Sequence, residues 1–321
     1  MTDPLDLAIC STCGTQFSTP SYPASCKICD DPRQYVPPTG QSWTTLRTLR
    51  DSQNPSYTNV FTPDPIHKDA LISIHTEPKQ AIGQRAYLCR TNLERPSGSG
   101  TFNLLWDCIT YIDDETIARI KELGGIDAIV ISHPHYYTTH LLWAEIFECP
   151  VYLSAEDEEW VVVRGEKQVF FTEAELCFSG AKSWVNTAVG SEKTEGEAEL
   201  VVIKTGGHFP GSTVLWWKGL GTLLIADTIA VVPSARYWVG RLPGTASFTF
   251  MWSYPNMIPL SADDVHVIWN AVKHTDFEIT RGAFTGMETD TDSKKRFLDS
   301  AKIFVKAMGY LDHAIYQEEC L

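Results

Sequence analysis

Two histidines separated by a single residue constrain this chain more than any other feature of its sequence. They are His133 and His135, and they follow the largely apolar residues 126–131. A strand that ends in such a pair brings two imidazoles together at the edge of a sheet. Pro134 between them makes a turn that lets both rings face one metal ion. A His-x-His pair alone is a weak signal, so its meaning depends on further ligands along the chain.

Three further candidate metal ligands lie just after segments whose apolar residues predict a strand or a helix. His208 and Asp227 each follow a strand-like apolar run, and His274 follows a helix-like segment. Loops held by a rigid sheet are where ligand side chains gather. We expect His274 to bind metal, to bond to substrate or to orient Asp227. The predicted metal ligands at this site are His133, His135, His208, Asp227 and His274.

The order of these residues resembles the metallo-β-lactamase superfamily. Residues 103–107 look like its early strand, which ends in an aspartate, here Asp107, and a helical segment over 113–123 precedes the strand to His133. The resemblance covers the chain from roughly residue 70 onward. It implies an α/β fold of the αββα sandwich type for residues 41–321, with two mixed sheets and helices outside. It also implies a metal-assisted hydrolase.

The chain departs from the family motif at two positions. The motif His-x-His-x-Asp-His is matched at its two first histidines, but Tyr137 and Thr138 stand where Asp and His normally build a second metal position. The first position stays complete, which favours one catalytic metal. Tyr137 either donates a hydrogen bond to a developing oxyanion or fills the volume of the lost metal, and the sequence is consistent with both interpretations. His140 is a candidate replacement ligand, but a structural role inside a helix is favoured.

The resemblance and the ligand types together predict hydrolysis through a metal-activated water. Zinc held by three histidines leaves one position to water, whose pKa then falls to about 7. Catalytic roles are predicted for Asp227 as base and proton shuttle, and for Tyr137 and His274. The expected substrates are small esters, lactones, lactams or thioesters. Two alternatives stay open: an iron dioxygenase with a triad of His133, His208 and Asp227, and a binding protein without turnover.

Two Cys-x2-Cys pairs near the N-terminus predict a second, structural metal site. They are Cys10, Cys13, Cys26 and Cys29. This spacing suits tetrahedral zinc, and the short segment has too few apolar residues to fold without a metal. Gly14 follows the first pair, where a knuckle turn needs a permissive backbone. We predict a zinc-ribbon-like module with its linker over residues 1–40, ahead of two disulfides or unligated thiols.

The charge and hydropathy of the chain indicate which classes of binding partner are expected. The chain has 26 Lys and Arg against 40 Asp and Glu, a net charge of −14, which disfavours binding to nucleic-acid phosphates. No apolar run reaches the ~20 residues of a membrane span, and the first residues lack a basic region, so a cytoplasmic protein without membrane contact is expected. A small-molecule substrate is the expected partner.

A long segment rich in aromatic residues follows Asp227 and extends to Pro259. It carries Tyr237, Trp238, Phe248, Phe250, Trp252 and Tyr254, with Arg236 and Arg241. Loops of this length are uncommon unless they are functional. We expect the rings either to wall a pocket for an aromatic or apolar substrate, or to pack against outer helices or a homodimer partner.

Overall fold

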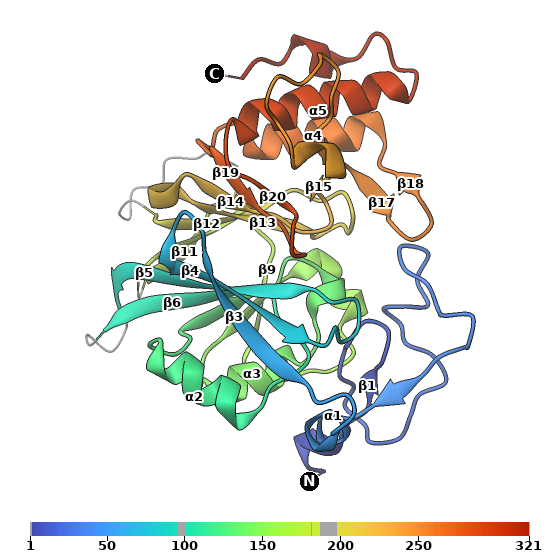
Figure 1. Cartoon of the computed structure of the whole chain (residues 1–321), viewed down its shortest axis with the longest axis vertical. Coiled ribbons are helices and arrows are strands. Elements are labelled where there is room, and N and C mark those ends of the chain that lie inside the picture. Colours follow the sequence, from blue (N-terminus) through green and yellow to red (C-terminus); the bar gives the residue numbers. More distant parts are fainter. Residues whose placement is uncertain (1, 96–99, 181, 187–197, 321) are drawn as a thin grey trace. The chain divides into compact units, whose positions relative to one another are not determined.

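The computed structural model describes residues 2–95, 100–180, 182–186 and 198–320 (Figure 1). The chain divides into two compact units, Met1–Phe171 and Thr172–Leu321. Each unit contains its own seven-stranded mixed sheet together with helices. The predicted boundary at residue 40 concerns a smaller module inside the first unit and stays a proposal.

The sheet of the first unit combines an antiparallel and a parallel half. In spatial order its strands are β3 (Thr58–Asp64), β4 (Lys68–Glu77), β5 (Arg85–Glu94), β6 (Thr101–Trp106), β7 (Ala128–Val130), β8 (Val151–Ser154) and β9 (Gln168–Phe171). Strands β3 to β6 pair antiparallel, and β6 to β9 pair parallel. Since parallel strands end at the same edge, the residues after β6 and β7 meet there.

Helices α2 (Asp114–Glu122) and α3 (His140–Ile146) connect the parallel strands and lie along the sheet of the first unit (Figure 1). The predicted helix over 113–123 forms because Asp113 caps its first turn, accepting from the backbone N–H of Thr116. Acidic residues occupy this first turn and basic residues the last, as the helix dipole favours. Helix α1 (Leu46–Asp51) lies near the N-terminus, and short 3₁₀ helices cover Pro4–Asp6, Pro134–Tyr136 and Ala155–Trp160.

The N-terminal module has little regular structure of its own. Strand β1 (Ile9–Cys10) pairs antiparallel with β2 (Trp43–Thr44), so the paired segment extends past residue 40. Cysteine side chains occupy much of its buried interior. A segment with so small an apolar core depends on a metal or on contacts with the rest of the unit for its stability.

The sheet of the second unit is mainly antiparallel. In spatial order its strands are β11 (Lys182–Asn186), β10 (Glu175–Ser179), β12 (Leu200–Lys204), β13 (Thr213–Trp217), β14 (Thr222–Leu224), β19 (Ile279–Arg281) and β20 (Glu288–Thr289). Strands β14 and β19 run parallel. Two small hairpins lie outside the sheet: β15 (Ala230–Val231) with β16 (Phe248–Thr249), and β17 (Met251–Ser253) with β18 (Ile258–Pro259). Further 3₁₀ helices are Lys218–Leu220, Pro233–Ala235 and Ala314–Gln317.

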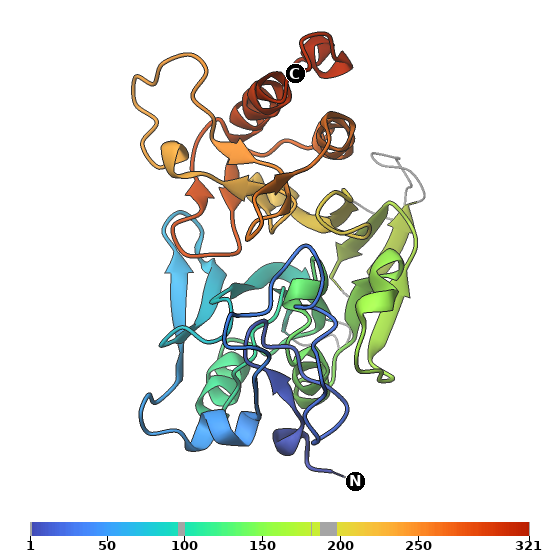
Figure 2. The same cartoon turned by 90° about the vertical axis from the view of Figure 1, so that its right-hand side faces the viewer.

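Helices α4 (Ala262–Val272) and α5 (Ser293–Ala307) lie together across one face of the second sheet (Figures 1 and 2). Alternate strand residues such as Val201, Ile203 and Trp216 point to this face, because side chains alternate along a strand. They share one core with Trp269 of α4 and Phe297 of α5. The second unit is therefore a sheet covered on one face by two amphipathic helices.

Several rings of the aromatic segment belong to that same core. Phe248 and Phe250 are buried, with ring centroids 5.8 Å and 5.2 Å from the ring of Phe297. The guanidinium of Arg296 lies 4.2 Å from the centroid of Trp238. For these residues the structure supports packing against an outer helix. No helix in the part of the chain that the structure describes is long and apolar enough to cross a membrane.

Candidate metal centres

The four cysteines of the N-terminal module come together as a closed group. All four thiols are free and buried, and their sulfur atoms lie within 4.8 Å of one another. The Sγ atoms of Cys10 and Cys29 are 3.6 Å apart, and those of Cys13 and Cys26 are 3.7 Å apart. A tetrahedral site with metal–sulfur bonds of about 2.3 Å has edges of about 3.8 Å. The cysteines fit a shared metal ion, and the disulfide alternative is wrong.

Local hydrogen bonds shape both cysteine knuckles. The N–H of Gly14 donates to the carbonyl of Cys10, and the N–H of Asp30 donates to that of Cys26, both at 2.8 Å. Gly14 has φ +82°, and a Cβ there would lie 1.9 Å from Oγ1 of Thr110. Both the backbone conformation and the lack of space therefore require glycine at this position, as expected. Burial raises the pKa of the Cys13 thiol, so thiolates here need a cation beside them.

Gln41 joins the two knuckles. Its amide Nε2 donates to Sγ of Cys10, and its Oε1 accepts from the N–H of Cys26, both at 3.2 Å. Such support around a metal ligand orients it and tunes its charge. The sequence patterns did not single out Gln41, because one glutamine outside a Cys-x2-Cys pair carries no spacing signal.

The cysteine module contacts the segment that carries the histidine pair. The N–H of Gln16 donates to the carbonyl of Thr138 at 2.9 Å, and Oγ1 of Thr110 donates to the carbonyl of Gly14 at 3.1 Å. Oγ1 of Thr139 in turn donates to the carbonyl of Thr110 at 2.9 Å. The module therefore touches the segment after β6 and the segment before α3.

A second set of contacts ties the module to the 3₁₀ helix Ala155–Trp160. The indole N–H of Trp160 donates to the carboxylate of Asp31 at 3.1 Å, and the guanidinium of Arg33 lies 5.3 Å from the Trp160 ring centroid. The ammonium of Lys27 donates to the carbonyl of Glu159. Both cationic side chains of the module, Lys27 and Arg33, therefore contact residues of this 3₁₀ helix.

His133 and His135 lie where β7 ends, as the sequence predicts. The 3₁₀ helix that begins at Pro134 turns the chain between them, and the ring centroids are 5.1 Å apart. Nδ1 of His133 is 2.9 Å from Oγ of Ser132, and the N–H of Ser132 donates to Asp107 Oδ1 at 2.7 Å. With Nδ1 held in this way, Nε2 is the ligand atom that His133 presents.

Asp107 supports the pair from the neighbouring parallel strand. It follows β6 directly, it is buried, and its backbone has φ +60°. Its own N–H donates to the carbonyl of Val130, the last residue of β7, at 2.8 Å. The strand-end aspartate singled out by the sequence therefore acts on His133 through Ser132.

Tyr137 and His140 are held by neighbours within the first unit. The hydroxyl of Tyr137 donates to the carbonyl of Asp157 at 3.2 Å, and burial raises the pKa of this phenol well above its ordinary value. Nδ1 of His140 lies 2.6 Å from the carbonyl of Tyr137, and its Nε2 lies 2.8 Å from Nε2 of Gln168. Burial lowers the pKa of His140 to about 4. These contacts hold both side chains among residues of the first unit.

His208 and Asp227 face each other in the second unit. The carboxylate Oδ2 of Asp227 lies 3.7 Å from Nε2 of His208, while Nδ1 of His208 lies 3.0 Å from the carbonyl of Met251. Two atoms that share a metal through bonds of about 2.1 Å are about 3.4 Å apart in an ideal tetrahedron. The pair is thus spaced as two ligands of one ion, with the His208 ring oriented by β17.

Two glycines and a threonine shape the loop that carries His208. Gly206 and Gly207 have φ +64° and +91°, which other residues rarely adopt. A Cβ on Gly207 would lie 2.6 Å from Oγ1 of Thr228, and that hydroxyl donates to the carbonyl of Gly206 at 2.7 Å. Because Thr228 follows Asp227 directly, this bond ties the two ligand loops together.

His274 occupies a different part of the second unit. Its Nε2 lies 3.2 Å from Oε1 of Glu175, and its ring centroid lies 6.0 Å from that of Trp216. Trp216 belongs to the core under α4 and α5, so His274 lies on the helix-covered face of the sheet. It also precedes β19, whereas Asp227 follows the parallel strand β14, so the two approach opposite ends of these strands. The structure places His274 with Glu175 rather than beside Asp227.

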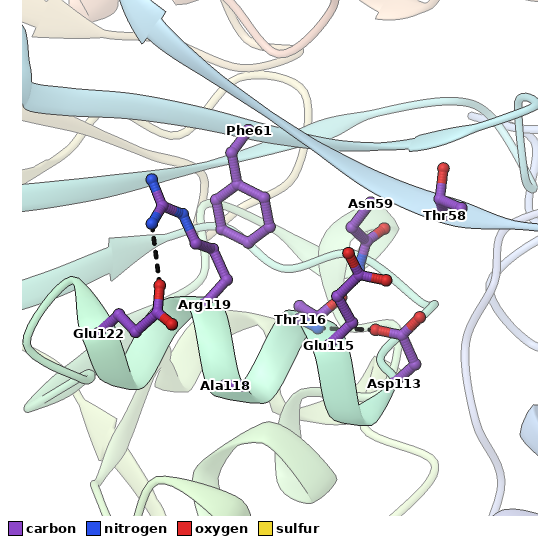
Figure 3. A pocket seen from close by; sticks show the side chains of 9 residues that line it. All are labelled: Thr58, Asn59, Phe61, Asp113, Glu115, Thr116, Ala118, Arg119 and Glu122. Carbon is purple, nitrogen blue, oxygen red and sulfur yellow. Dashed lines mark hydrogen bonds and ion pairs between the residues drawn. The ribbon is translucent and has the colours of Figure 1, made fainter.

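A groove between β3 and α2 lies apart from both metal groups (Figure 3). It has a volume of about 370 Å³ and is lined by Thr58, Asn59, Phe61, Asp113, Glu115, Thr116, Ala118, Arg119 and Glu122. Its charged groups serve the helix: Asp113 caps it, and Arg119 pairs with Glu122 at 2.9 Å. The groove contains none of the predicted ligands.

Comparison with known proteins decides the family. The family model of the metallo-beta-lactamase superfamily matches residues 97–258. A protein of Bacillus subtilis (strain 168), called uncharacterized protein YmaE, is 40% identical over 308 residues, which cover 94% of this chain and 96% of that protein. The chain belongs to the metallo-beta-lactamase superfamily. The predicted α/β fold of the metallo-beta-lactamase type, with its N-terminal cysteine module, is confirmed.

Solved structures of other proteins match this metallo-beta-lactamase superfamily member at low sequence identity. The metallo-beta-lactamase FIM-1 from Pseudomonas aeruginosa, in its mono-zinc form, is 13% identical, with a TM-score of 0.48 and coverage of 78% of this chain and 96% of that one. The chemotaxis sensor ODP, in a peroxy diiron state, is 14% identical, with a TM-score of 0.46 and coverage of 77% and 94%.

Proposed function

We propose that this superfamily member is a hydrolase in which His133, His135, His208 and Asp227 hold one catalytic metal ion. The observation that carries the proposal is the donor set, three imidazoles and a carboxylate that are all buried. Two of the rings are also oriented through Nδ1, by Ser132 and by Met251. Buried ionisable groups are retained when they bind a charge or do chemistry.

The ligand types favour zinc and a single ion. Imidazole and carboxylate donors suit zinc, and the four thiolates of the N-terminal module suit a closed structural zinc site. Tyr137, at a position where the family motif has an aspartate, donates to Asp157, and His274 pairs with Glu175. Since both are held by other groups, they do not support a second ion.

Asp227 is the proposed base, and its carboxylate also faces His208. A bound zinc ion would supply a water of lowered pKa as the nucleophile. Asp227 would accept the proton that the water loses and pass it to the leaving group. The proposed substrates are small esters, lactones, lactams or thioesters, for which an attacking water and a proton shuttle are sufficient.

Metal content per chain, measured by elemental analysis, tests the metal assignment. We expect two zinc atoms in the wild-type protein and one in His133→Ala, which keeps the cysteine site. His75→Ala is the matched control, since His75 lies in β4 beside Glu77. Three zinc atoms in the wild type would rule out a single catalytic ion. Iron in place of zinc, with oxygen consumption, would favour the dioxygenase alternative.

Turnover tests the activity itself. The wild-type protein, loaded with zinc, is assayed on p-nitrophenyl esters, a series of lactones, a β-lactam and an acyl thioester. We expect hydrolysis of at least one class, lost in His133→Ala and in Asp227→Asn but kept in His75→Ala. Full zinc occupancy without hydrolysis of any class would favour the binding-protein alternative.

A further inference from the structure

Tyr254 brings a phenol to the candidate metal ligands of the second unit. It follows β17 directly, and its ring centroid lies 6.0 Å from that of His208. The same strand supplies Met251, whose carbonyl lies 3.0 Å from Nδ1 of His208. Burial, and next to it the charge of Asp227, raise the pKa of the Tyr254 hydroxyl well above its ordinary value. One short strand therefore orients a ligand and places a phenol beside it.

The hydroxyl of Tyr254 is buried and has no hydrogen-bond partner among the residues that the structure describes. Two other phenols differ: Tyr137 donates to the carbonyl of Asp157, and Tyr316 donates to the carbonyl of Tyr310. Burying a hydroxyl without a partner costs stability, so native folds rarely do it. Phenylalanine would provide the same packing without that cost. The hydroxyl is therefore placed to meet a ligand.

The backbone holds this residue in place. The N–H of Met257 donates to the carbonyl of Tyr254 at 3.1 Å, which closes the turn between β17 and β18. Ser253, the residue before, is buried, and its Oγ accepts from the side-chain amide of Asn256 at 3.1 Å. A donor held in advance costs little reorganisation when charge develops beside it.

We propose that Tyr254 is a further catalytic residue, whose hydroxyl donates a hydrogen bond to the acyl oxygen of the substrate. This role rests on the proposed hydrolase function and adds to it the group that stabilises the oxyanion. The water oxygen bonds to the acyl carbon, and the electron pair of the C=O double bond moves to the acyl oxygen that Tyr254 contacts.

The same contact serves the second half of the reaction. When that electron pair returns, the bond from the acyl carbon to the leaving oxygen, nitrogen or sulfur breaks. The leaving group takes the proton that the water gave to Asp227. Tyr254 keeps its own proton throughout, so one water molecule is consumed and no other reactant is needed.

The variant Tyr254→Phe tests the proposal with three readouts. We expect kcat on the best ester of the panel to fall about 10²- to 10³-fold with zinc content unchanged, as when an oxyanion donor is removed. The affinity for phenylphosphonate, a tetrahedral anion that mimics the attacked acyl group, should fall at least tenfold. The unfolding temperature of the metal-free protein should rise, because an unpaired buried hydroxyl is removed. Tyr316→Phe is the matched control and should change neither kcat nor phosphonate affinity.

The outcomes separate this role from the hydrolase function. If the wild-type protein hydrolyses no ester, phosphonate binding still decides: weaker binding by Tyr254→Phe upholds the donor, and equal or absent binding overturns it. If the wild type is active and Tyr254→Phe keeps its kcat, the proposal is wrong while the hydrolase function stands. A lower unfolding temperature with unchanged phosphonate affinity would make Tyr254 a packing residue.

Discussion

The backbone N–H of Gln16 donates a hydrogen bond to the carbonyl oxygen of Thr138, with an N···O distance of 2.9 Å. Gln16 lies in the cysteine module, and Thr138 lies three residues after His135. Thr138 has φ +39°, a left-handed conformation that a β-branched residue rarely adopts. Surrounding contacts must hold such a residue in place. The module is therefore part of the support of the histidine pair.

This contact predicts that the two metal groups are coupled. Cys13→Ser removes one of four thiolates, so we expect loss of the structural metal and a fall in zinc affinity at the histidine site. The reason is that Gln16 then no longer holds the carbonyl of Thr138 in place. The measurement is zinc per chain during titration with a chelator.

Cys89→Ser is the control for that substitution, because Cys89 is a buried cysteine of β5 outside the module. It removes a thiol of the same kind without touching the metal ligands. If Cys13→Ser loses its structural zinc while the histidine site keeps wild-type affinity, the coupling is absent.

The strand-end aspartate should act on metal affinity. Asp107→Asn keeps an oxygen for the N–H of Ser132, and asparagine tolerates the observed φ of +60°. It removes the negative charge behind Ser132 and His133. Because such indirect support typically matters 10- to 100-fold, we expect zinc affinity to fall about tenfold. Competition with a chromogenic chelator measures it, and unchanged affinity would show that only the oxygen matters.

Tyr137 should contribute mainly through packing. Tyr137→Phe removes the donor to the buried carbonyl of Asp157, so we expect a loss of about 1–2 kcal/mol in the free energy of unfolding. Its effect on kcat/KM should stay below about tenfold, less than the loss of an oxyanion donor produces. Urea unfolding and ester hydrolysis provide the two readouts. A hundredfold loss of kcat at unchanged stability would instead support the predicted catalytic role.

His140 should make stability depend on pH. Its pKa is lowered by burial from 6.5 to about 4, so between these values the unfolded chain binds more protons than the folded one. Stability from this group is therefore full above pH 6.5 and falls as the pH drops toward 4. The total is about 3 kcal/mol, of which roughly 2 kcal/mol falls between about pH 7 and pH 5.

His140→Gln removes this titration and keeps an amide that can donate to the carbonyl of Tyr137. Urea unfolding of both proteins at the two pH values gives the difference, in which contributions from other titrating groups cancel. Equal slopes of stability against pH in both proteins would show that His140 does not cause the loss.

Most correct predictions of ligands and helix bounds came from patterns that span only a few residues. The ends of apolar runs located His133, His208 and Asp227, because a strand length and its following loop are encoded within a few residues. Cys-x2-Cys spacing located the thiol group for the same reason. The helical segment predicted over 113–123 agrees with α2 to within one residue at each end.

Residues far apart in the chain decided the rest. His274 follows a helix, where the sequence predicts a ligand, yet the fold places it on the helix-covered face beside Glu175. Tyr137 occupies a motif position, yet its hydroxyl meets a carbonyl of a 3₁₀ helix twenty residues later. Neither contact has a local pattern, because both depend on how sheets, helices and turns pack together.

By itself, then, the sequence determined which residues could bind metal and which superfamily the chain belongs to, since ligand type and spacing are local properties. Only the tertiary structure decided what surrounds them. The Gln16–Thr138 hydrogen bond joins backbone atoms, which leave no mark in a residue pattern. The unpaired hydroxyl of Tyr254 is visible only once its neighbours are placed, because a missing partner is a property of packing.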